Sequence, residues 1–384
     1  MLDRARFKNP GTIVLALLFV SVVLASGCTT SIEPRLVARG ASPDPTATPA
    51  PVQFTTGGGQ SRNDEFDHDS RLEWWYYSGH LESESGREFG FHFVLFKADN
   101  GAGEPNLIAQ LGLLDVETGK HFELYRAQAG FGGGVRANGA MTVAIADWDY
   151  TVTSTAGSHS FSAVNGQETE VELSLSFEAT APVMLHNEIG WLPTETGATY
   201  YYSWPRQSVV GQLVVGGESF EVTGSAWFDH QWGDFFVLGT PAGWQWFAVQ
   251  LDDGGSLMIT EARGIDGEVV DTYGTYMSPE GEVSNLQGDS DGIRIALGGE
   301  WTSPGTGAIY PSGWALEIDS LGMELALEPV ASDQEVLAGL PIGSAYWEGK
   351  VRVGGRQDGQ PITGDAYVEL SGYTDPEPIP WLRR

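Results

Sequence analysis

Short apolar runs bounded by turn residues make up most of the chain beyond about residue 60. Residues 74–81 and 89–96 flank a polar segment containing Ser85-Gly86, which predicts a β-hairpin. Residues 247–251 and 256–260 flank Asp253-Gly254, a favoured two-residue turn. Further strands are predicted at residues 107–116, 141–152, 171–177, 212–222, 313–318 and 366–370.

This pattern predicts an all-β fold. Many short strands separated by turns are typical of barrels and sandwiches, whereas parallel sheets alternate strands with long helices. The 51 glycines and 13 tryptophans fit an all-β chain with tight turns. Aromatic residues occupy both faces of the first hairpin. One face is therefore expected to pack as core while the other lines an enclosed apolar cavity.

The N-terminus has the features of an export signal. A basic stretch ending at Lys8 precedes an apolar run at residues 12–25, and Ser26-Gly27-Cys28 follows at once. This arrangement resembles a bacterial lipobox, which implies a signal peptide at residues 1–27 and a lipid on Cys28. The protein would be anchored to a bacterial membrane, on its periplasmic or cell-surface side. The alternative is a plain secretory signal with an incidental cysteine.

Composition divides the rest of the chain. Residues 28–56 are rich in Thr, Ser and Pro, which predicts a tether. The remaining stretch of about 325 residues exceeds one ordinary core, so we expect two domains, at residues 57–240 and 241–384. The formal net charge of -31 makes nucleic acid a poor partner and favours solubility after export.

The block from Trp227 to Asp234 concentrates chemistry in a chain with seven histidines. Side chains alternate between the two faces of a strand, so His230 and Trp232 are expected to point one way and Asp229 the other. A proton-handling ring on an aromatic wall suits chemistry on an apolar molecule. It equally suits a buried polar anchor between two sheets.

Several segments together resemble the lipocalin-like superfamily that holds AttH-like proteins and carotenoid 1,2-hydratases. The resemblance runs in the family's order from about residue 60 to 375. It implies two consecutive lipocalin-like antiparallel β-barrel domains that bind apolar molecules. Members include cofactor-free hydratases of isoprenoid double bonds, some cyclases and many proteins without an assigned activity. The segments are residues 71–80, 200–206, 227–233, 244–254, 346–349 and 367–373.

Hydration of an alkene without a cofactor needs a strong proton donor, an aromatic face for the cation and a positioned water. The resemblance carries a functional role onto His230 and Trp232. His230 would orient the water or a neighbouring acid, and the Trp232 indole would stabilise the cation. The donor should be a carboxyl that an apolar setting keeps neutral.

Three carboxylates compete for the acid role. Asp229 is expected to face away from His230. If Asp253-Gly254 forms a two-residue turn, Glu261 lies opposite Trp246. Glu73 begins the first aromatic strand, and for each carboxylate the alternative is a surface position. The residues predicted to bind the substrate are Glu73, Trp75, Tyr77, His92 and Trp246.

No metal site and no cofactor are predicted. His80 and His92 lie on the first hairpin, where a two-residue turn would place them on opposite faces and a three-residue turn on the same face. The chain has no His-x-His or His-Glu-x-x-His motif and no cysteine cluster.

Two functional classes remain. The first is a cofactor-free hydratase or cyclase acting on an isoprenoid-like or polyketide-like molecule. The second is a lipid-anchored carrier that stores or hands over an apolar ligand without turnover. A structural interaction module is the third reading, if side chains fill the cavity.

Overall fold

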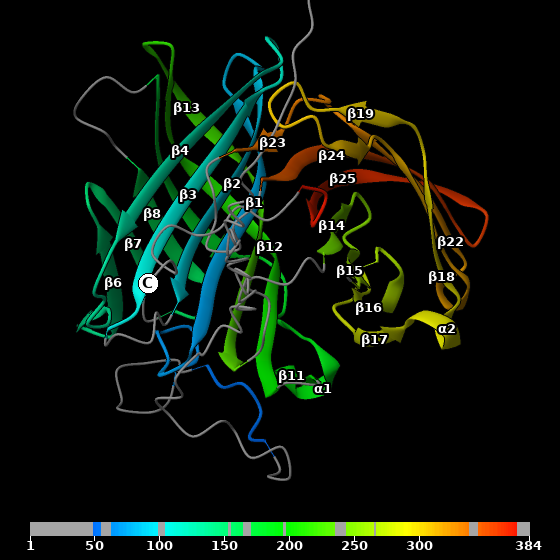
Figure 1. Ribbon diagram of the computed structural model, residues 1–384, viewed down its shortest axis with the longest axis horizontal. Coiled ribbons are helices and arrows are strands. Elements are labelled where there is room, and N and C mark those ends of the chain that lie inside the picture. Colours follow the sequence, from blue (N-terminus) through cyan, green and yellow to red (C-terminus); the bar gives the residue numbers. More distant parts are fainter. Residues whose placement is uncertain are drawn as a thin grey trace, which may run out of the picture. The chain divides into compact units, whose positions relative to one another are not determined.

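The computed structural model describes residues 49–54, 63–98, 104–152, 155–163, 170–194, 197–234, 243–264, 266–337 and 345–374 (Figure 1). The signal peptide, Cys28 and most of the tether lie outside the described residues, so these assignments stay predictions. Among the described residues, no helix combines the length and hydrophobicity that a membrane span requires.

The first sheet holds the strands up to Asp234. They are β1 (Leu72–Ser83), β2 (Glu88–Ala98), β3 (Asn106–Asp115), β4 (Lys120–Gln128), β5 (Val135–Ala137), β6 (Ala140–Ile145), β7 (Trp148–Val152), β8 (Ser158–Ala163), β9 (Val171–Ala179), β10 (Met184–Leu185), β11 (Trp191–Thr194), β12 (Gly197–Val215) and β13 (Glu218–Asp234). Their order is β4-β3-β2-β1-β13-β12-β9-β8-β7-β6-β5, with β10 and β11 paired to β12. The short helix α1 (Asn187–Gly190) precedes β11.

The second sheet begins at Gly243. Its strands are β14 (Gly243–Leu251), β15 (Ser256–Arg263), β16 (Val269–Met277), β17 (Val283–Gln287), β18 (Ile293–Leu297), β21 (Trp314–Ile318), β22 (Met323–Pro329), β23 (Glu335–Val336), β24 (Tyr346–Gln357) and β25 (Gln360–Ser371). They follow the order β17-β16-β15-β14-β25-β24-β22-β21-β18, with β23 beside β24. The remaining elements are the β19 (Glu300–Thr302) and β20 (Ile309–Pro311) pair, α2 (Gly288–Asp291) and η1 (Asp319–Leu321).

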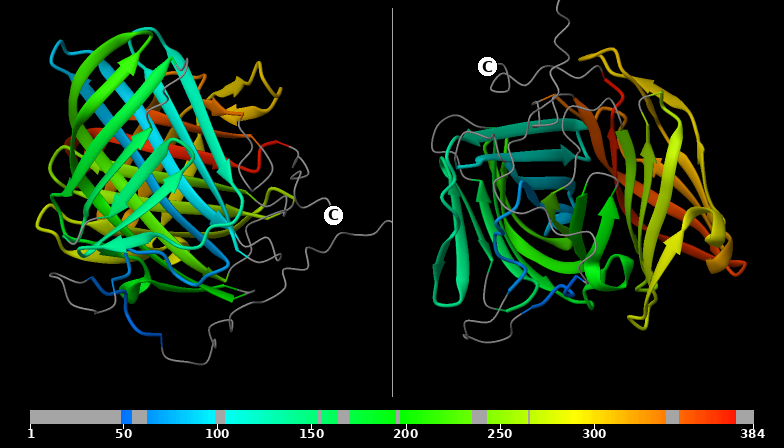
Figure 2. Two further views of the ribbon diagram at one scale, coloured as in Figure 1. Left: turned by 90° about the vertical axis from the view of Figure 1, so that its left-hand side faces the viewer. Right: turned by 60° about the horizontal axis from the view of Figure 1, so that its bottom comes forward.

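Both sheets are antiparallel and strongly curved, as Figure 2 shows from two sides. One forms a nearly closed barrel and the other a half-barrel, which confirms the prediction of two lipocalin-like barrels. Each sheet encloses its own apolar core. The predicted limits of the two domains, at residues 57–240 and 241–384, are not tested by this observation.

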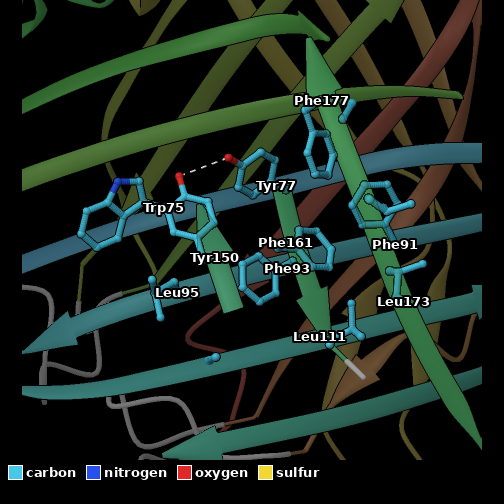
Figure 3. Packing of buried hydrophobic residues seen from close by; sticks show 14 of the residues in the cluster. Trp75, Tyr77, Phe91, Phe93, Leu95, Leu111, Tyr150, Phe161, Leu173 and Phe177 are labelled. Carbon is cyan, nitrogen blue, oxygen red and sulfur yellow. Dashed lines mark hydrogen bonds between the residues drawn. The ribbon is translucent and has the colours of Figure 1, made fainter. Parts of the chain in front are cut away.

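The core of the first barrel is built largely from aromatic rings (Figure 3). Alternate residues of β1 and β2 point into it, and the rings of Phe93 and Phe161 stack with centroids 4.2 Å apart. The hydroxyl groups of Tyr77 and Tyr150 meet at 3.2 Å within this core. One face of the first hairpin therefore packs as core, as expected from the sequence.

Two predicted strands are in fact hairpins. Residues 141–152 split into β6 and β7 at Ala146-Asp147, where Ile145 pairs with Trp148. Residues 212–222 span the end of β12 and the start of β13, joined by Gly216-Gly217. Both glycines have positive φ, as the tight turns between adjacent strands require. The Gly216-Gly217 pair is a turn signal in the sequence, whereas Ala146-Asp147 carries no such signal.

The structure fixes the register of two hairpins. In the first it decides between two alternatives that the sequence left open, and in the second it contradicts the prediction. In the β1–β2 hairpin His80 lies opposite Gly90, so the loop has three residues and His80 and His92 share a face. In the β14–β15 hairpin Gln245 lies opposite Glu261. The prediction that Trp246 faces Glu261 was wrong, because the turn has three residues rather than two.

The outer face of the first barrel packs on the second sheet. We call this the intersheet layer; its apolar part includes Tyr76 and Trp227 from the first sheet and Trp246 and Met258 from the second. Hydrogen bonds cross it, such as the one from the Tyr346 hydroxyl to the Gln110 side chain at 3.0 Å. Strands β1 and β13 therefore carry core on one face and the intersheet layer on the other.

Candidate functional site

Strand β13 presents polar side chains on both faces, as its alternation predicts. Phe228 and Trp232 belong to the core of the first barrel, whereas Trp227 belongs to the intersheet layer. Asp229 also faces outward and accepts hydrogen bonds from the hydroxyls of Ser203 and Tyr201 and from the Trp227 indole. Asp229 and His230 therefore belong to different sites.

Sheet register brings a carboxylate to His230. In β1, Glu73 lies opposite Trp232 of β13 and opposite Lys97 of β2, while Trp75 lies opposite His230. Glu73 Oε1 lies 3.0 Å from His230 Nε2, and its Oε2 accepts a hydrogen bond from Lys97 Nζ at 2.5 Å.

His68 completes this group from the segment that precedes β1. Its Nδ1 lies 2.7 Å from Glu73 Oε1. Its ring stacks on Trp232 with centroids 3.9 Å apart. We call His68, Glu73, Lys97, His230 and Trp232 the inner cluster.

The inner cluster holds an ionised carboxylate. Burial alone would raise the pKa of Glu73, but the charges of Lys97 and His68 and the histidine hydrogen bonds hold it well below 4.5. Burial lowers the pKa of His230 to about 4, even though Glu73 opposes this. Glu73 is therefore a poor proton donor at neutral pH, and His230 is neutral.

His230 and Trp232 are packed tightly among rings. The side chains of His230 and Trp232 are 0% and 4% exposed. The Trp75 ring stacks on His230 at 4.9 Å, and the Tyr200 ring stacks on Trp232 at 5.1 Å. Of the two interpretations open to this block, the packing favours a buried polar anchor, but the anchor lies inside the first barrel rather than between two sheets.

Tyr77 lies deeper in the same barrel. Its hydroxyl is 2.6 Å from His159 Nδ1, and His159 Nε2 is 3.1 Å from Glu65 Oε1. This network continues to the Trp204 indole, which donates to the same oxygen at 3.0 Å. Tyr77 is a core residue with satisfied polar contacts.

A second group of acids lies in the intersheet layer. Glu348 of β24 and Glu369 of β25 are direct neighbours across the ladder, and Trp246 of β14 is the next residue in the row. The Tyr76 hydroxyl of the first sheet donates a hydrogen bond to Glu348 Oε1. We call Tyr76, His92, Glu348 and Glu369 the intersheet acid site.

These acids are held in the neutral form. Burial raises the pKa of Glu348 well above 4.5, and the nearby Glu369 raises it further. Burial likewise raises the pKa of Glu369 to about 8, against a hydrogen bond from Trp244. Two neighbouring carboxyls, one buried and one half-buried, cannot both ionise readily.

His92 faces Glu348 across the layer. Its Nε2 lies 3.7 Å from Glu348 Oε2, and burial lowers its pKa well below 6.5. Both groups are thus neutral, and the separation exceeds a hydrogen bond. Within the described residues, neither His92 nitrogen has a hydrogen-bond partner, nor has the Ser78 hydroxyl directly across the ladder.

Unpartnered buried polar atoms are rare, because each costs about 1–3 kcal/mol. Their gathering beside a neutral acid indicates a place for a small polar group. The Tyr346 and Tyr367 rings lie 6.3 and 6.4 Å from the His92 ring, so the surroundings are aromatic.

Glu261 lies on the opposite face of the second sheet from Trp246. Its Oε1 accepts hydrogen bonds from Gln245 at 2.9 Å and from Arg263 at 2.8 Å. Trp246 instead donates to the Tyr201 hydroxyl at 3.1 Å. The structure therefore does not bring Glu261 and Trp246 together.

A Gly-x-Ser-x-Gly pattern at residues 288–292 does not form a nucleophile elbow. It forms α2, which leads from β17 to β18 rather than from a buried strand into a long helix. Ser290 is exposed, and its hydroxyl bonds to Gln287 and Asp291.

Sequence reasoning missed five residues of these two sites, which are His68, Tyr76, Lys97, Glu348 and Glu369. His68 and Lys97 come from segments without a motif, and long-range register alone brings them to Glu73. Glu348 and Glu369 were within reach, since both lie in the segments that carry the lipocalin-like resemblance. Buried carboxyls in aromatic strands were the available signal.

Comparison with known proteins agrees with this fold. A family model described as AttH-like matches residues 61–373. No curated protein matches the chain. A crystal structure of a candidate AttH protein from Nitrosomonas europaea is 29% identical, with a TM-score of 0.71, and covers 84% of this chain and 100% of its own.

Two further solved structures share the fold at lower identity. Kievitone hydratase from Nectria haematococca is 15% identical with a TM-score of 0.64, and covers 84% of this chain and 96% of its own. CghA is 12% identical with a TM-score of 0.55, and covers 86% of this chain and 96% of its own.

Proposed function

This chain belongs to the AttH-like family, and from that premise we propose that it is a cofactor-free hydratase that adds water to a carbon–carbon double bond of an apolar, isoprenoid-like molecule. The observation that carries the proposal is that neutral Glu348 lies 3.7 Å from neutral His92, whose ring nitrogens have no hydrogen-bond partner in the part of the chain that the structure describes. Hydration needs one group to give a proton and another to take one. One solved structure with this fold is a hydratase.

Glu348 is the proposed acid. An alkene is a weak base, so its protonation requires a carboxyl that still carries a proton at neutral pH. Burial and the adjacent Glu369 keep the pKa of Glu348 well above 4.5. Glu73, the acid nearest His230, is ionised and cannot fill this role.

His92 is the proposed base. The proton moves from Glu348 to one alkene carbon and leaves a cation on the more substituted carbon. Water adds to that cation and gives one proton to His92 Nε2. A proton transfer from His92 Nε2 to Glu348 Oε2, 3.7 Å away, returns both side chains to their starting protonation states.

The aromatic residues stabilise the cation. Tyr76 contacts the acid through its hydroxyl, and the rings of Tyr346 and Tyr367 lie beside His92. A desolvated cation over the face of one such ring would gain on the order of 1–2 kcal/mol. This contribution assists the acid and cannot replace it. His230 and Trp232, which lie on the barrel side of β13, then act as a buried anchor.

The test is conversion of acyclic isoprenoids with a terminal trisubstituted double bond in water enriched in heavy oxygen. Mass spectrometry should detect one labelled hydroxyl. Glu348→Gln and His92→Ala should each lower the rate by about 10²–10⁴-fold, the usual range for an acid or base. Glu261→Gln, on the other face of the second sheet, should stay near the wild-type rate.

Thermal unfolding of each variant separates chemistry from loss of fold. An unchanged rate in folded Glu348→Gln would remove Glu348 as the acid. If the wild-type protein retains the isoprenoid through purification and returns it unchanged, the protein is a carrier and the hydratase proposal fails.

A further inference from the structure

The inner cluster has the composition of a metal site. His68 Nδ1, Glu73 Oε1 and His230 Nε2 come from three segments and lie within 4.8 Å of one another. Two imidazoles and one carboxylate form a set that Zn²⁺ accepts, with water in the fourth position. We propose that these residues bind a divalent transition-metal ion of the Zn²⁺ class, independently of the proposed hydratase activity.

The outer nitrogen of each histidine is also held. His68 Nε2 lies 3.4 Å from Asp64 Oδ1, and His230 Nδ1 lies 3.2 Å from the Tyr202 hydroxyl. Metal-binding histidines nearly always have such a partner on the second nitrogen, because it fixes the ring and the tautomer. The inner nitrogens therefore both face Glu73 Oε1.

Lys97 contacts the carboxylate oxygen of Glu73 that the proposed site does not use. Its ammonium binds the other carboxylate oxygen, Glu73 Oε2, and the His68 carbonyl. Among the described residues, Oε1 contacts only the two imidazoles and the His68 backbone N–H, so an ion that replaces the imidazole contacts would take Oε1 as a single ligand. Asp64, Glu65 and Glu73 all act electrostatically on Tyr202, which borders the cluster, so acidic groups gather where the positive charge would be added.

Binding would exchange protons for metal. His68 would release its Nδ1 proton to water and keep the proton on Nε2 beside Asp64, whereas neutral His230 would move its proton from Nε2 to Nδ1 beside the Tyr202 hydroxyl. The freed lone pairs of His68 Nδ1 and His230 Nε2 would then bond to the ion. His68 is 19% exposed, whereas Glu73 and His230 are fully buried, so His68 marks the entry side. The ion would fasten the segment before β1 to β1 and β13.

Calorimetric titration of the tag-free, chelator-treated protein with ZnCl₂ tests the proposal, together with visible absorption after Co²⁺ addition. We expect one ion per chain and a raised Tm. His68→Ala and Glu73→Gln should weaken Zn²⁺ binding by more than about 100-fold, and Tyr202→Phe by about 10–100-fold. His121→Ala, outside the cluster, should bind like wild type.

His68→Ala is the primary variant, because its partly exposed side chain can be removed without a large cavity. Binding below one ion per chain in wild type would overturn the proposal. So would binding that survives both His68→Ala and Glu73→Gln, since the ion would then sit elsewhere. Zn²⁺ binding and isoprenoid conversion are measured separately, so either proposal can fail alone.

Discussion

At the residue scale, one strand shows how far a local pattern reaches. Alternation correctly separates Asp229 from His230 and places Glu73 on the face of Trp75 and Tyr77. It says nothing of protonation, which depends on neighbours far along the chain. Lys97 and His68 make Glu73 an anion, whereas burial and the adjacent Glu369 keep Glu348 neutral.

Glu369 makes stability depend on pH. Its pKa is raised to about 8 in the folded protein, against an ordinary value of 4.5. Between these values the folded state binds more protons than the unfolded state, so the free energy of unfolding falls as pH rises from about 4.5 to about 8, by at most about 1.4 kcal/mol per unit.

Urea denaturation at pH 5 and pH 8 measures this effect. The Glu369→Gln variant removes the titrating group and should show a smaller difference between the two pH values than wild type. An equal difference in both proteins would mean that Glu369 is ionised in the folded state at neutral pH.

At the element scale, hairpin loops decide which side chains meet. The Asp253-Gly254 pair suggests a two-residue turn, but the loop has three residues and Gly254 adopts φ +103°. A register shift of one residue changes which side chains share a face, so Glu261 pairs with Gln245 instead of Trp246. In the first hairpin the three-residue loop places His80 and His92 on the same face, a point that the sequence left open. Strand existence was readable from the pattern, and register was not.

Strand β3 lies directly beside the proposed base, His92. Gly112 lies opposite His92, and a Cβ at this position would come within 2.2 Å of the imidazole ring. Gly112→Ala should therefore displace His92, lower the hydration rate by about tenfold or more, and cost about 1–3 kcal/mol of stability through overpacking.

Product formation and urea denaturation check both parts of this prediction. Gly354→Ala in β24 is the matched control, because no atom of the described residues lies within 4 Å of the added Cβ. A Gly112→Ala variant with wild-type rate and stability would show that the His92 ring has space to move.

At the scale of the whole molecule, the fold was more accessible to sequence reasoning than the site. Apolar spacing and turn residues predict an all-β chain, and the ordered segments from residue 60 to 375 resemble one superfamily. Both inferences hold. The intersheet acid site depends on how two separate sheets pack, which no local pattern encodes.

Membrane anchoring is a further prediction about the whole protein. If Cys28 carries a lipid, the protein expressed in a bacterium should enter the detergent phase on phase separation, and Cys28→Ser should shift it to the aqueous phase. Mass spectrometry of the mature N-terminus would identify the modification. An aqueous wild-type protein with an unmodified cysteine would support a plain secretory signal.

Strands β1 and β13 separate the inner cluster from the intersheet layer, so any coupling between a metal ion on one side and a ligand on the other would act through these strands. Trp75 and Tyr76 are adjacent in the chain, as are Asp229 and His230, yet each pair serves both sides. If an ion in the inner cluster changes affinity for an apolar ligand in the intersheet layer, the ligand must change affinity for the ion by the same factor.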